Sequence, residues 1–153
     1  MKHSLKIAIV LLAFYGCGKS KPDTLIESYD KQEMDAAIAR ARSETDKFIA
    51  ELSAPTGTGH AVKAPITDGE QTEHFWLTDV VFQNGQFTGT INNDPGLVTN
   101  VKIGQKRTLK KEEISDWMFI RDGKMYGNYT MRPLFKAMPE AQAAKFRAML
   151  AEP

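Results

Sequence analysis

A regular apolar stripe between residues 31 and 52 is the strongest pattern in the chain. Its apolar positions recur at alternating steps of four and three residues, which is the period of one face of an α-helix: Met34, Ile38, Ala41, Thr45, Phe48 and Leu52. Asp30 followed by Glu33 fits a capping box at the start of this segment. We therefore predict one amphipathic helix over 31–52, about six turns long, with its stripe on the core.

Beyond Pro55 the spacing of apolar residues changes to the alternation of β-strands. Residues 62–66 alternate, and residues 73–82 are rich in β-branched and aromatic side chains. Asn84-Gly85 follows at once and is typical of a tight hairpin turn, since both turn residues need positive φ. We expect the second strand of this hairpin at 86–91, where Gly89 indicates a bulge or a close backbone approach.

The second half of the chain contains further strands and one more helix. Residues 106–109 predict a short strand, and residues 110–115 a tight turn or one helical turn. Segments 116–120 and 125–130 flank Asp122-Gly123 and predict a second hairpin. Pro139 begins a helix that carries Ala143, Phe146 and Leu150.

The pattern as a whole predicts an α+β fold in a single domain, residues 30–153. Its parts are an N-terminal amphipathic helix, an antiparallel sheet of five or six strands built from hairpins, and a C-terminal helix. The chain is long enough for such a domain to bury a core of its own.

The first sixteen residues have the pattern of a secretory signal peptide. Lys2 and Lys6 give a basic start, and nine consecutive apolar residues follow from Ile7 to Tyr15. A run of this length is typical of a signal peptide and too short for a conventional membrane-spanning helix. We expect residues 1–16 to be a signal peptide and residues 17–29 to be a tether before the domain.

Gly16-Cys17 closes this apolar run and resembles the lipobox of bacterial lipoproteins, in which the cysteine is lipidated and becomes the mature N-terminus. Phe14 and Tyr15 depart from the leucine and the small residue usual in a lipobox. The expected location is the periplasmic side of a bacterial membrane, with a lipid on Cys17 as the membrane anchor. A soluble periplasmic protein, an uncleaved anchor and a buried N-terminal strand or helix are the alternatives.

Composition and charge argue against several functional classes. Apolar residues make up 42% of the chain and charged residues 25%, which is ordinary for a globular protein. The formal net charge is +1, and 18 basic against 19 acidic residues remain without residues 1–16. Such a balance argues against nucleic acid as a partner. Cys17 is the only cysteine, so one chain forms neither a disulfide nor a cysteine-based zinc site.

No motif for catalysis or metal binding stands out in the sequence. His60 and His74 are the histidines outside the signal peptide, and they lack the spacing of a metal site. A Gly-x-Ser-x-Gly nucleophile elbow is absent. We predict no catalytic residue, no metal and no cofactor.

Several motifs from residue 73 to residue 132 resemble those of the YegJ-like family of bacterial domains of unknown function. They include His74-Phe-Trp-Leu77, Gly104-Gln105, Ile114-Ser-Asp-Trp-Met118, and Asp122-Gly123 followed by Gly127-x-Tyr129-Thr130-x-Arg132. A further motif runs from Phe87 to Pro95. The resemblance implies a small α+β domain that is often exported, and it brings no activity or catalytic residue with it.

Asp116, Trp117, Tyr129 and Arg132 are the candidate binding residues. The Asp122-Gly123 turn brings them to one end of the sheet, where they form either a polar pocket or a buried ion pair with aromatic rings around it. The leading functional interpretation is a non-enzymatic interaction module of the cell envelope with a protein partner. The alternative is a small-ligand binder or weak hydrolase that uses this site.

Overall fold

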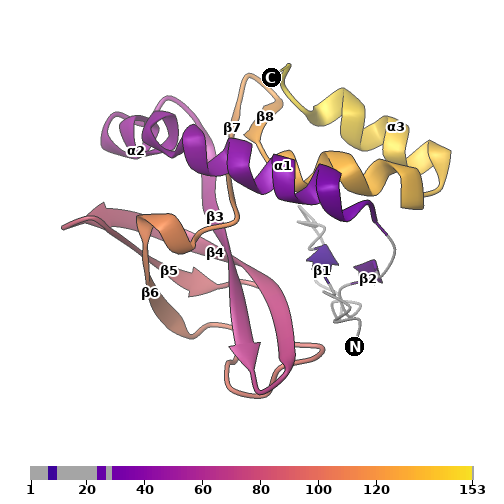
Figure 1. The fold of residues 1–153 in the computed structure, drawn as a ribbon. Helices are drawn as coiled ribbons and strands as arrows, with labels where there is room; N and C mark the ends of the chain where they lie inside the picture. The colour runs from indigo at the N-terminus through magenta and orange to yellow at the C-terminus, as the bar shows by residue number, and fades with distance from the viewer. Residues whose placement is uncertain (1–6, 10–23, 27–28, 153) are drawn as a thin grey trace.

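The computed structural model describes residues 7–9, 24–26 and 29–152, and its centre is a six-stranded antiparallel sheet (Figure 1). The strand order is β6-β5-β4-β3-β7-β8. The strands of this sheet are β3 (Thr58–Asp68), β4 (Gln71–Gln83), β5 (Gln86–Ile91), β6 (Lys106–Lys110), β7 (Asp116–Arg121) and β8 (Lys124–Gly127). The α+β fold expected from the sequence, with an antiparallel sheet between helices, is confirmed.

The hairpin predicted at Asn84-Gly85 joins β4 to β5. Asn84 and Gly85 have φ of 52° and 78°, as the turn requires. The close approach predicted at Gly89 is also present, because a Cβ there would lie 2.9 Å from the Thr78 carbonyl oxygen. The β4–β5 register shifts between Thr78 and Val81, so a bulge in β4 faces this glycine.

The predicted N-terminal helix is divided into α1 (Lys31–Ser43) and α2 (Thr45–Ser53), separated at Glu44. The Ala41 carbonyl accepts the Trp117 indole N–H at 2.9 Å and the Thr45 hydroxyl at 3.1 Å. These donors replace the backbone donor that would continue the helix. The single helix predicted over 31–52 is therefore wrong at this point, although the apolar stripe continues across the break.

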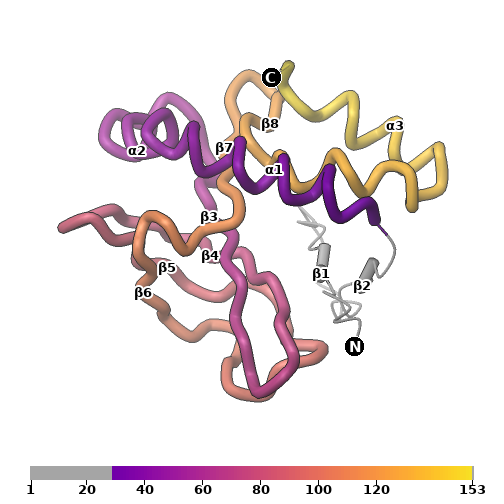
Figure 2. Tube along the Cα trace, in the orientation of Figure 1, coloured from indigo at the N-terminus to yellow at the C-terminus, as the bar shows by residue number. Residues whose placement is uncertain are grey.

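Helices α1 and α2 cover one face of the sheet and enclose the main core. Figures 1 and 2 show α1 crossing over β3 and β7, and α2 contacts β4 and β7. Phe48 of α2 is fully buried and packs on Phe87 and Trp117, with ring centroids 6.0 and 5.5 Å away. Val62 and Leu77 belong to the same cluster. The stripe thus docks on the sheet through its central residues.

The predicted strand 125–130 ends early, because β8 stops at Gly127. Asn128 has a φ of 48° in the left-handed region, and it turns the chain into the 3₁₀ helix η2 (Tyr129–Ala137). A second short 3₁₀ helix, η1 (Lys111–Glu113), lies where the sequence predicts a turn or one helical turn. The turn at Asn128 places Tyr129 beyond the edge of the sheet rather than in it.

The 3₁₀ helix η2 packs beside α1, and helix α3 (Glu140–Met149) packs on η2 (Figure 1). Met34 of α1 and Leu134 of η2 are both fully buried in one small cluster. After α3 the chain returns to the free edge of β8, where Leu150 forms a parallel bridge with Met125 and the Ala151 N–H donates to the Met125 carbonyl at 2.8 Å. Residues 150 and 151 therefore cover this sheet edge.

A second, two-stranded sheet pairs β1 (Ile7–Ile9) with β2 (Thr24–Ile26). These strands fall within the predicted signal peptide and tether, but Cys17 and most of residues 1–29 lie outside the described residues. The signal peptide, the tether and the lipidation of Cys17 therefore stay predictions. No helix among the described residues is long and apolar enough to cross a membrane.

Candidate functional site

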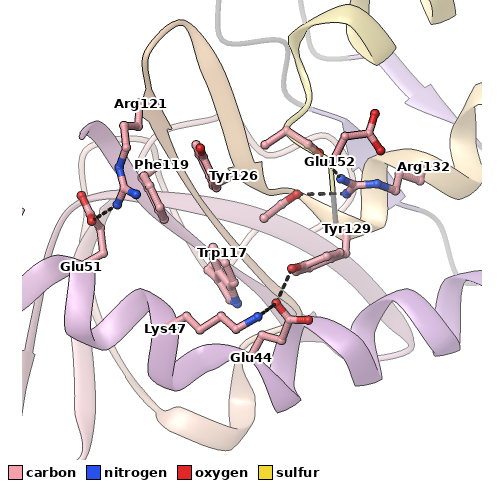
Figure 3. A pocket seen from close by; sticks show the side chains of 12 residues that line it. Glu44, Lys47, Glu51, Trp117, Phe119, Arg121, Tyr126, Tyr129, Arg132 and Glu152 are labelled. Carbon is pink, nitrogen blue, oxygen red and sulfur yellow. Dashed lines mark hydrogen bonds and ion pairs between the residues drawn. The ribbon is translucent and has the colours of Figure 1, made fainter. Parts of the chain in front are cut away.

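Three of the four predicted binding residues line one cavity of about 310 Å³ (Figure 3). Trp117, Tyr129 and Arg132 face it, whereas Asp116 is fully buried outside its lining. The cavity lies between the α1–α2 junction, β7, β8, the start of η2 and residues 151–152. We call it the aromatic groove.

The wall of the aromatic groove is a row of stacked rings. Trp117 and Phe119 are alternate residues of β7, so they share a sheet face, and their rings stack with centroids 6.1 Å apart. Tyr126 lies opposite Phe119 in the β7–β8 register, and these two rings are parallel at 5.0 Å. Tyr129 contacts Trp117 edge-on at 5.7 Å. Sequence reasoning found Trp117 and Tyr129 but missed Phe119 and Tyr126, although their alternation in a hairpin was visible.

At one end of the groove, Tyr129 is tied to the helix junction. Its hydroxyl donates to Glu44 Oε2 at 2.6 Å, and Lys47 Nζ donates to the same oxygen at 2.9 Å. The hydrogen bond from Tyr129, followed by that from Lys47, lowers the pKa of Glu44 to about 2. Burial, together with Glu44, raises the pKa of Tyr129 to about 12. The groove therefore presents a carboxylate and a neutral phenol here.

At the other end, Glu51 holds Arg121 against the rings. Glu51 Oε1 accepts the backbone N–H groups of Thr56 at 2.8 Å and Gly57 at 2.7 Å, while Oε2 accepts Arg121 Nη2 at 2.5 Å. Burial acts to raise the pKa of Glu51, but the hydrogen bonds outweigh it and lower that pKa to about 2. The Arg121 guanidinium carbon lies 5.0 Å from the centre of the Phe119 ring. Arg121 is thus fixed by an ion pair and by cation–π contact.

Arg132 is held by carbonyl groups rather than by a carboxylate. Its Nη1 donates to the carbonyls of Gly127 at 3.0 Å and Asn128 at 3.2 Å, and its Nη2 donates to that of Ala151 at 3.2 Å. Its guanidinium carbon also lies 5.1 Å from the centre of the Tyr129 ring. Burial lowers the pKa of Arg132. Among the described residues, no carboxylate forms a direct ion pair with Arg132.

Gly127 is required where the groove meets β7. Its φ is 75°, and an added Cβ would lie 2.2 Å from the Trp117 carbonyl oxygen and 2.6 Å from the indole ring. Only glycine allows this contact together with this backbone conformation. The residue therefore fixes the start of the turn that carries Tyr129 and Arg132.

Asp116 lies behind the groove in a buried network with Lys63, a residue that sequence reasoning missed. The Asp116 carboxylate accepts the backbone N–H groups of Tyr129 at 3.1 Å and Thr130 at 2.7 Å, and the Thr130 hydroxyl at 2.6 Å. Lys63 Nζ donates to that hydroxyl at 3.0 Å. Within the described chain Asp116 forms no ion pair with Arg132. The second of the two predicted arrangements, a buried ion pair, is therefore not found there. The sequence feature that could have indicated Lys63 is its position between two apolar residues, Val62 and Ala64, in a central strand.

His74 and Ser115 form the other notable polar pair, and both are buried. His74 Nδ1 lies 2.9 Å from Ser115 Oγ, whose hydroxyl also donates to the Lys63 carbonyl at 3.3 Å. Burial, together with the nearby cations Lys63 and Arg42, lowers the pKa of His74 to about 3. Ser115 is 1% exposed and His74 is 4% exposed, and both border a hollow between α1, β3 and β4. The pair is a buried hydrogen bond beside that hollow.

The groove is lined by four aromatic rings, two arginines, a lysine and three glutamates, with Gly127 and Ala151. Its twelve described residues include no serine, threonine, cysteine or histidine. Glu44 and Glu51, whose pKa values are about 2, are poorly matched to general acid–base catalysis near neutral pH. No group of three or more metal-ligating side chains occurs in residues 29–152 or in the other described segments.

This chain belongs to a family of bacterial proteins described as "Uncharacterized protein conserved in bacteria (DUF2314)", whose sequence profile matches residues 31–151. It is 52% identical over 146 residues to "Uncharacterized protein YegJ" of Escherichia coli, covering 94% of this chain and 95% of that one. The resemblance to the YegJ-like family is therefore confirmed.

A second relative shares only part of its length with this chain. A putative ankyrin repeat protein of Neisseria meningitidis serogroup B is 37% identical over 91 residues, which is 57% of this chain and 36% of that protein. No solved structure matches the chain.

Proposed function

We propose that this protein is a non-enzymatic binding module that presents the aromatic groove to a partner protein of the bacterial cell envelope. A lipid on Cys17 holds it at the periplasmic side of the membrane. The observation that supports this function best is the groove itself, in which the buried rings of Trp117, Phe119 and Tyr129 underlie partly exposed side chains, Tyr126, Arg121 and Arg132.

The residue types of the groove are those that dominate the energy of protein interfaces. Trp, Tyr and Arg are enriched at interface hot spots, where they fill well-packed pockets. Arg121 and Arg132 are held in place by Glu51 and by backbone carbonyls. A partner therefore meets side chains that lose little conformational entropy on binding.

The relationship to the Neisseria protein is compatible with a binding role. That protein is named for ankyrin repeats, and stacked repeats of this kind build extended binding surfaces. The 91-residue match is part of a protein with this name.

A small-molecule ligand is the second candidate, because a cavity of about 310 Å³ is at the lower end of the range for ligand pockets. The weak-hydrolase alternative is less favoured, since two of the three carboxylates that line the groove, Glu44 and Glu51, have a pKa of about 2.

Site-specific photo-crosslinking in living cells tests the groove. A photoreactive residue at Lys47, on the groove rim, should give a discrete adduct with a protein partner, and one at Lys145, exposed on α3, should not. Adding Tyr126→Ala should remove the Lys47 adduct while the protein stays folded by circular dichroism. Equal adducts at both positions, or an adduct that survives Tyr126→Ala, would exclude the groove as the docking site.

Fractionation and intact-mass measurement test the anchor. Protein extracted from membranes should begin at Cys17 and carry a diacyl or triacyl adduct there, and Cys17→Ser should release it from the membrane. A soluble species that retains Met1 would contradict both the signal peptide and the lipid.

A further inference from the structure

The opposite side of Tyr129 borders a second hollow, of about 350 Å³, between α1 and η2. Ala36 and Ala37 of α1 and Pro133 of η2 give it apolar walls, and Arg40 and Arg132 flank it. It shares Tyr129 and Arg132 with the aromatic groove but opens beside a different helix. We call it the arginine hollow.

Two guanidinium groups contact the same phenol ring in this hollow. The guanidinium carbons of Arg40 and Arg132 each lie 5.1 Å from the centre of the Tyr129 ring. They are close enough to repel, since Arg40 is among the causes that lower the pKa of Arg132. The hollow therefore has positive charge concentrated around Tyr129, which favours an anion there.

The carboxylates near the hollow leave these cations only partly neutralised. Glu33 lines the hollow, but its Oε1 accepts Lys136 Nζ. Glu44 accepts Arg40 Nε at 3.1 Å, which leaves the two terminal amino groups of Arg40 for another acceptor. In the described chain, every hydrogen bond that Arg132 donates goes to a backbone carbonyl. Within the described chain, Arg132 therefore keeps its Nε–H and one Nη2–H, and Arg40 keeps both terminal amino groups, without a carboxylate partner.

We propose that the arginine hollow binds an organic carboxylate attached to an apolar group, with the carboxylate on Arg132 and Arg40 and the apolar group on Ala36, Ala37 and Pro133. A guanidinium fork matches the geometry of a carboxylate, and the alanine and proline walls suit an apolar body. The carboxylate belongs either to a free organic acid or to the C-terminal residue of a polypeptide. This site shares Tyr129 and Arg132 with the aromatic groove, but the proposal does not rest on the partner proposed for that groove.

Nuclear magnetic resonance titration of the ¹⁵N-labelled full chain tests the site with defined probes. Benzoate should shift the backbone signals of Ala36, Ala37 and Tyr129 in a saturable way, whereas benzamide, its neutral counterpart, should not. N-acetylphenylalanine and its amide form a second pair. If this acid binds about tenfold more tightly than benzoate, the source is a polypeptide C-terminus; if benzoate binds at least as well, the source is a free acid.

Variants locate the binding and separate it from folding. Arg40→Gln should weaken benzoate binding about tenfold without unfolding the chain, because Arg40 is exposed. Arg132→Gln should weaken it at least as much, although this change also removes the hydrogen bonds from Arg132 to the carbonyls of Gly127 and Asn128. Arg147→Gln is the matched control, since Arg147 is exposed on α3 and lies 5.2 Å from the Phe135 ring. Equal shifts with benzoate and benzamide, or unchanged binding in Arg40→Gln, would overturn the proposal. The aromatic groove and its crosslinks would be unaffected by that result.

Discussion

Lys63 and Asp116 lie directly opposite each other on β3 and β7, both buried, and the hydroxyl of Thr130 connects them. This hydroxyl accepts from Lys63 Nζ at 3.0 Å and donates to Asp116 Oδ2 at 2.6 Å. Burial lowers the pKa of Lys63 to about 8, and burial raises the pKa of Asp116. The network fixes the first residues of η2, and through them both hollows at Tyr129.

A double-mutant cycle should show that Lys63 and Asp116 are coupled. Lys63→Met leaves the carboxylate buried without its counter-charge and should lower the free energy of unfolding by roughly 3–5 kcal/mol. Asp116→Asn should also destabilise the fold, and the double variant should lose at least about 1 kcal/mol less than the sum. Urea unfolding measures all four proteins. Lys145→Met, an exposed change on α3, should be additive with Asp116→Asn, and strict additivity for Lys63 as well would mean that the charges do not interact.

Two glycine substitutions should differ sharply although both residues have positive φ. Gly127→Ala places a Cβ against the Trp117 carbonyl, whereas at Gly123 no atom lies within 4 Å of the added carbon. Gly123→Ala should therefore cost about 1 kcal/mol from backbone strain alone, and Gly127→Ala several times more, or prevent folding. Thermal unfolding of both variants provides the comparison. Similar melting temperatures would show that the chain relaxes around Trp117 easily.

The stability of the protein should fall as the pH is lowered from about 6.5, because His74 stays neutral in the fold. Its folded pKa is about 3 and the ordinary value is 6.5, so between these limits the unfolded chain binds more protons. Stability is therefore full above pH 6.5 and decreases as the pH falls toward 3. In His74→Asn, which keeps a donor near Ser115, the urea midpoint should change less between pH 7 and pH 5. If stability depends on pH in the same way in His74→Asn, other groups cause the decrease.

A second decrease should follow at lower pH from Glu44 and Glu51. Both carboxylates have a folded pKa of about 2 against an ordinary 4.5, so the stability they provide is present above 4.5 and is lost as the pH falls toward 2. Glu44→Gln and Glu51→Gln should each reduce the slope of stability against pH in this window. The exposed Glu112→Gln serves as the control and should leave that slope intact.

The apolar stripe of the N-terminal helices should be decisive for stability. Phe48→Ala removes a fully buried ring and should cost about 3–5 kcal/mol. Lys47→Ala changes a side chain that is 70% exposed and should cost less than about 0.5 kcal/mol. Chemical denaturation of the two variants decides the point, and equal losses would mean that the buried face of α2 is assigned wrongly.

Local patterns were sufficient to predict most of the fold. The four-and-three spacing around Phe48, the Asn84-Gly85 turn and the Gly89 approach depend on neighbouring residues, so the sequence displays them directly. The break at Glu44 was not predictable in this way, because it depends on the Trp117 indole, which comes from a strand more than seventy residues away.

The candidate site was predicted only in part for the same reason. Trp117, Tyr129 and Arg132 were found because the Asp122-Gly123 turn places them at one end of the sheet. Lys63 was missed because cross-strand pairing of β3 with β7 is a long-range contact. Glu44 was missed because a residue in the middle of an expected helix gives no sign of a partner in η2.

The covering of β8 by residues 150 and 151 bears on how the protein tolerates shortening. A chain that ends before Leu150 would leave the Met125 carbonyl without the Ala151 N–H, and an unprotected strand edge of this kind promotes aggregation. The opposite edge, β6, carries Lys106, Arg107 and Lys110 and keeps its own charges as protection. The same truncation would also remove the Ala151 carbonyl from Arg132. Loss of a few residues here would therefore lower the solubility of the protein. It would also loosen Arg132, the cation that lines both hollows.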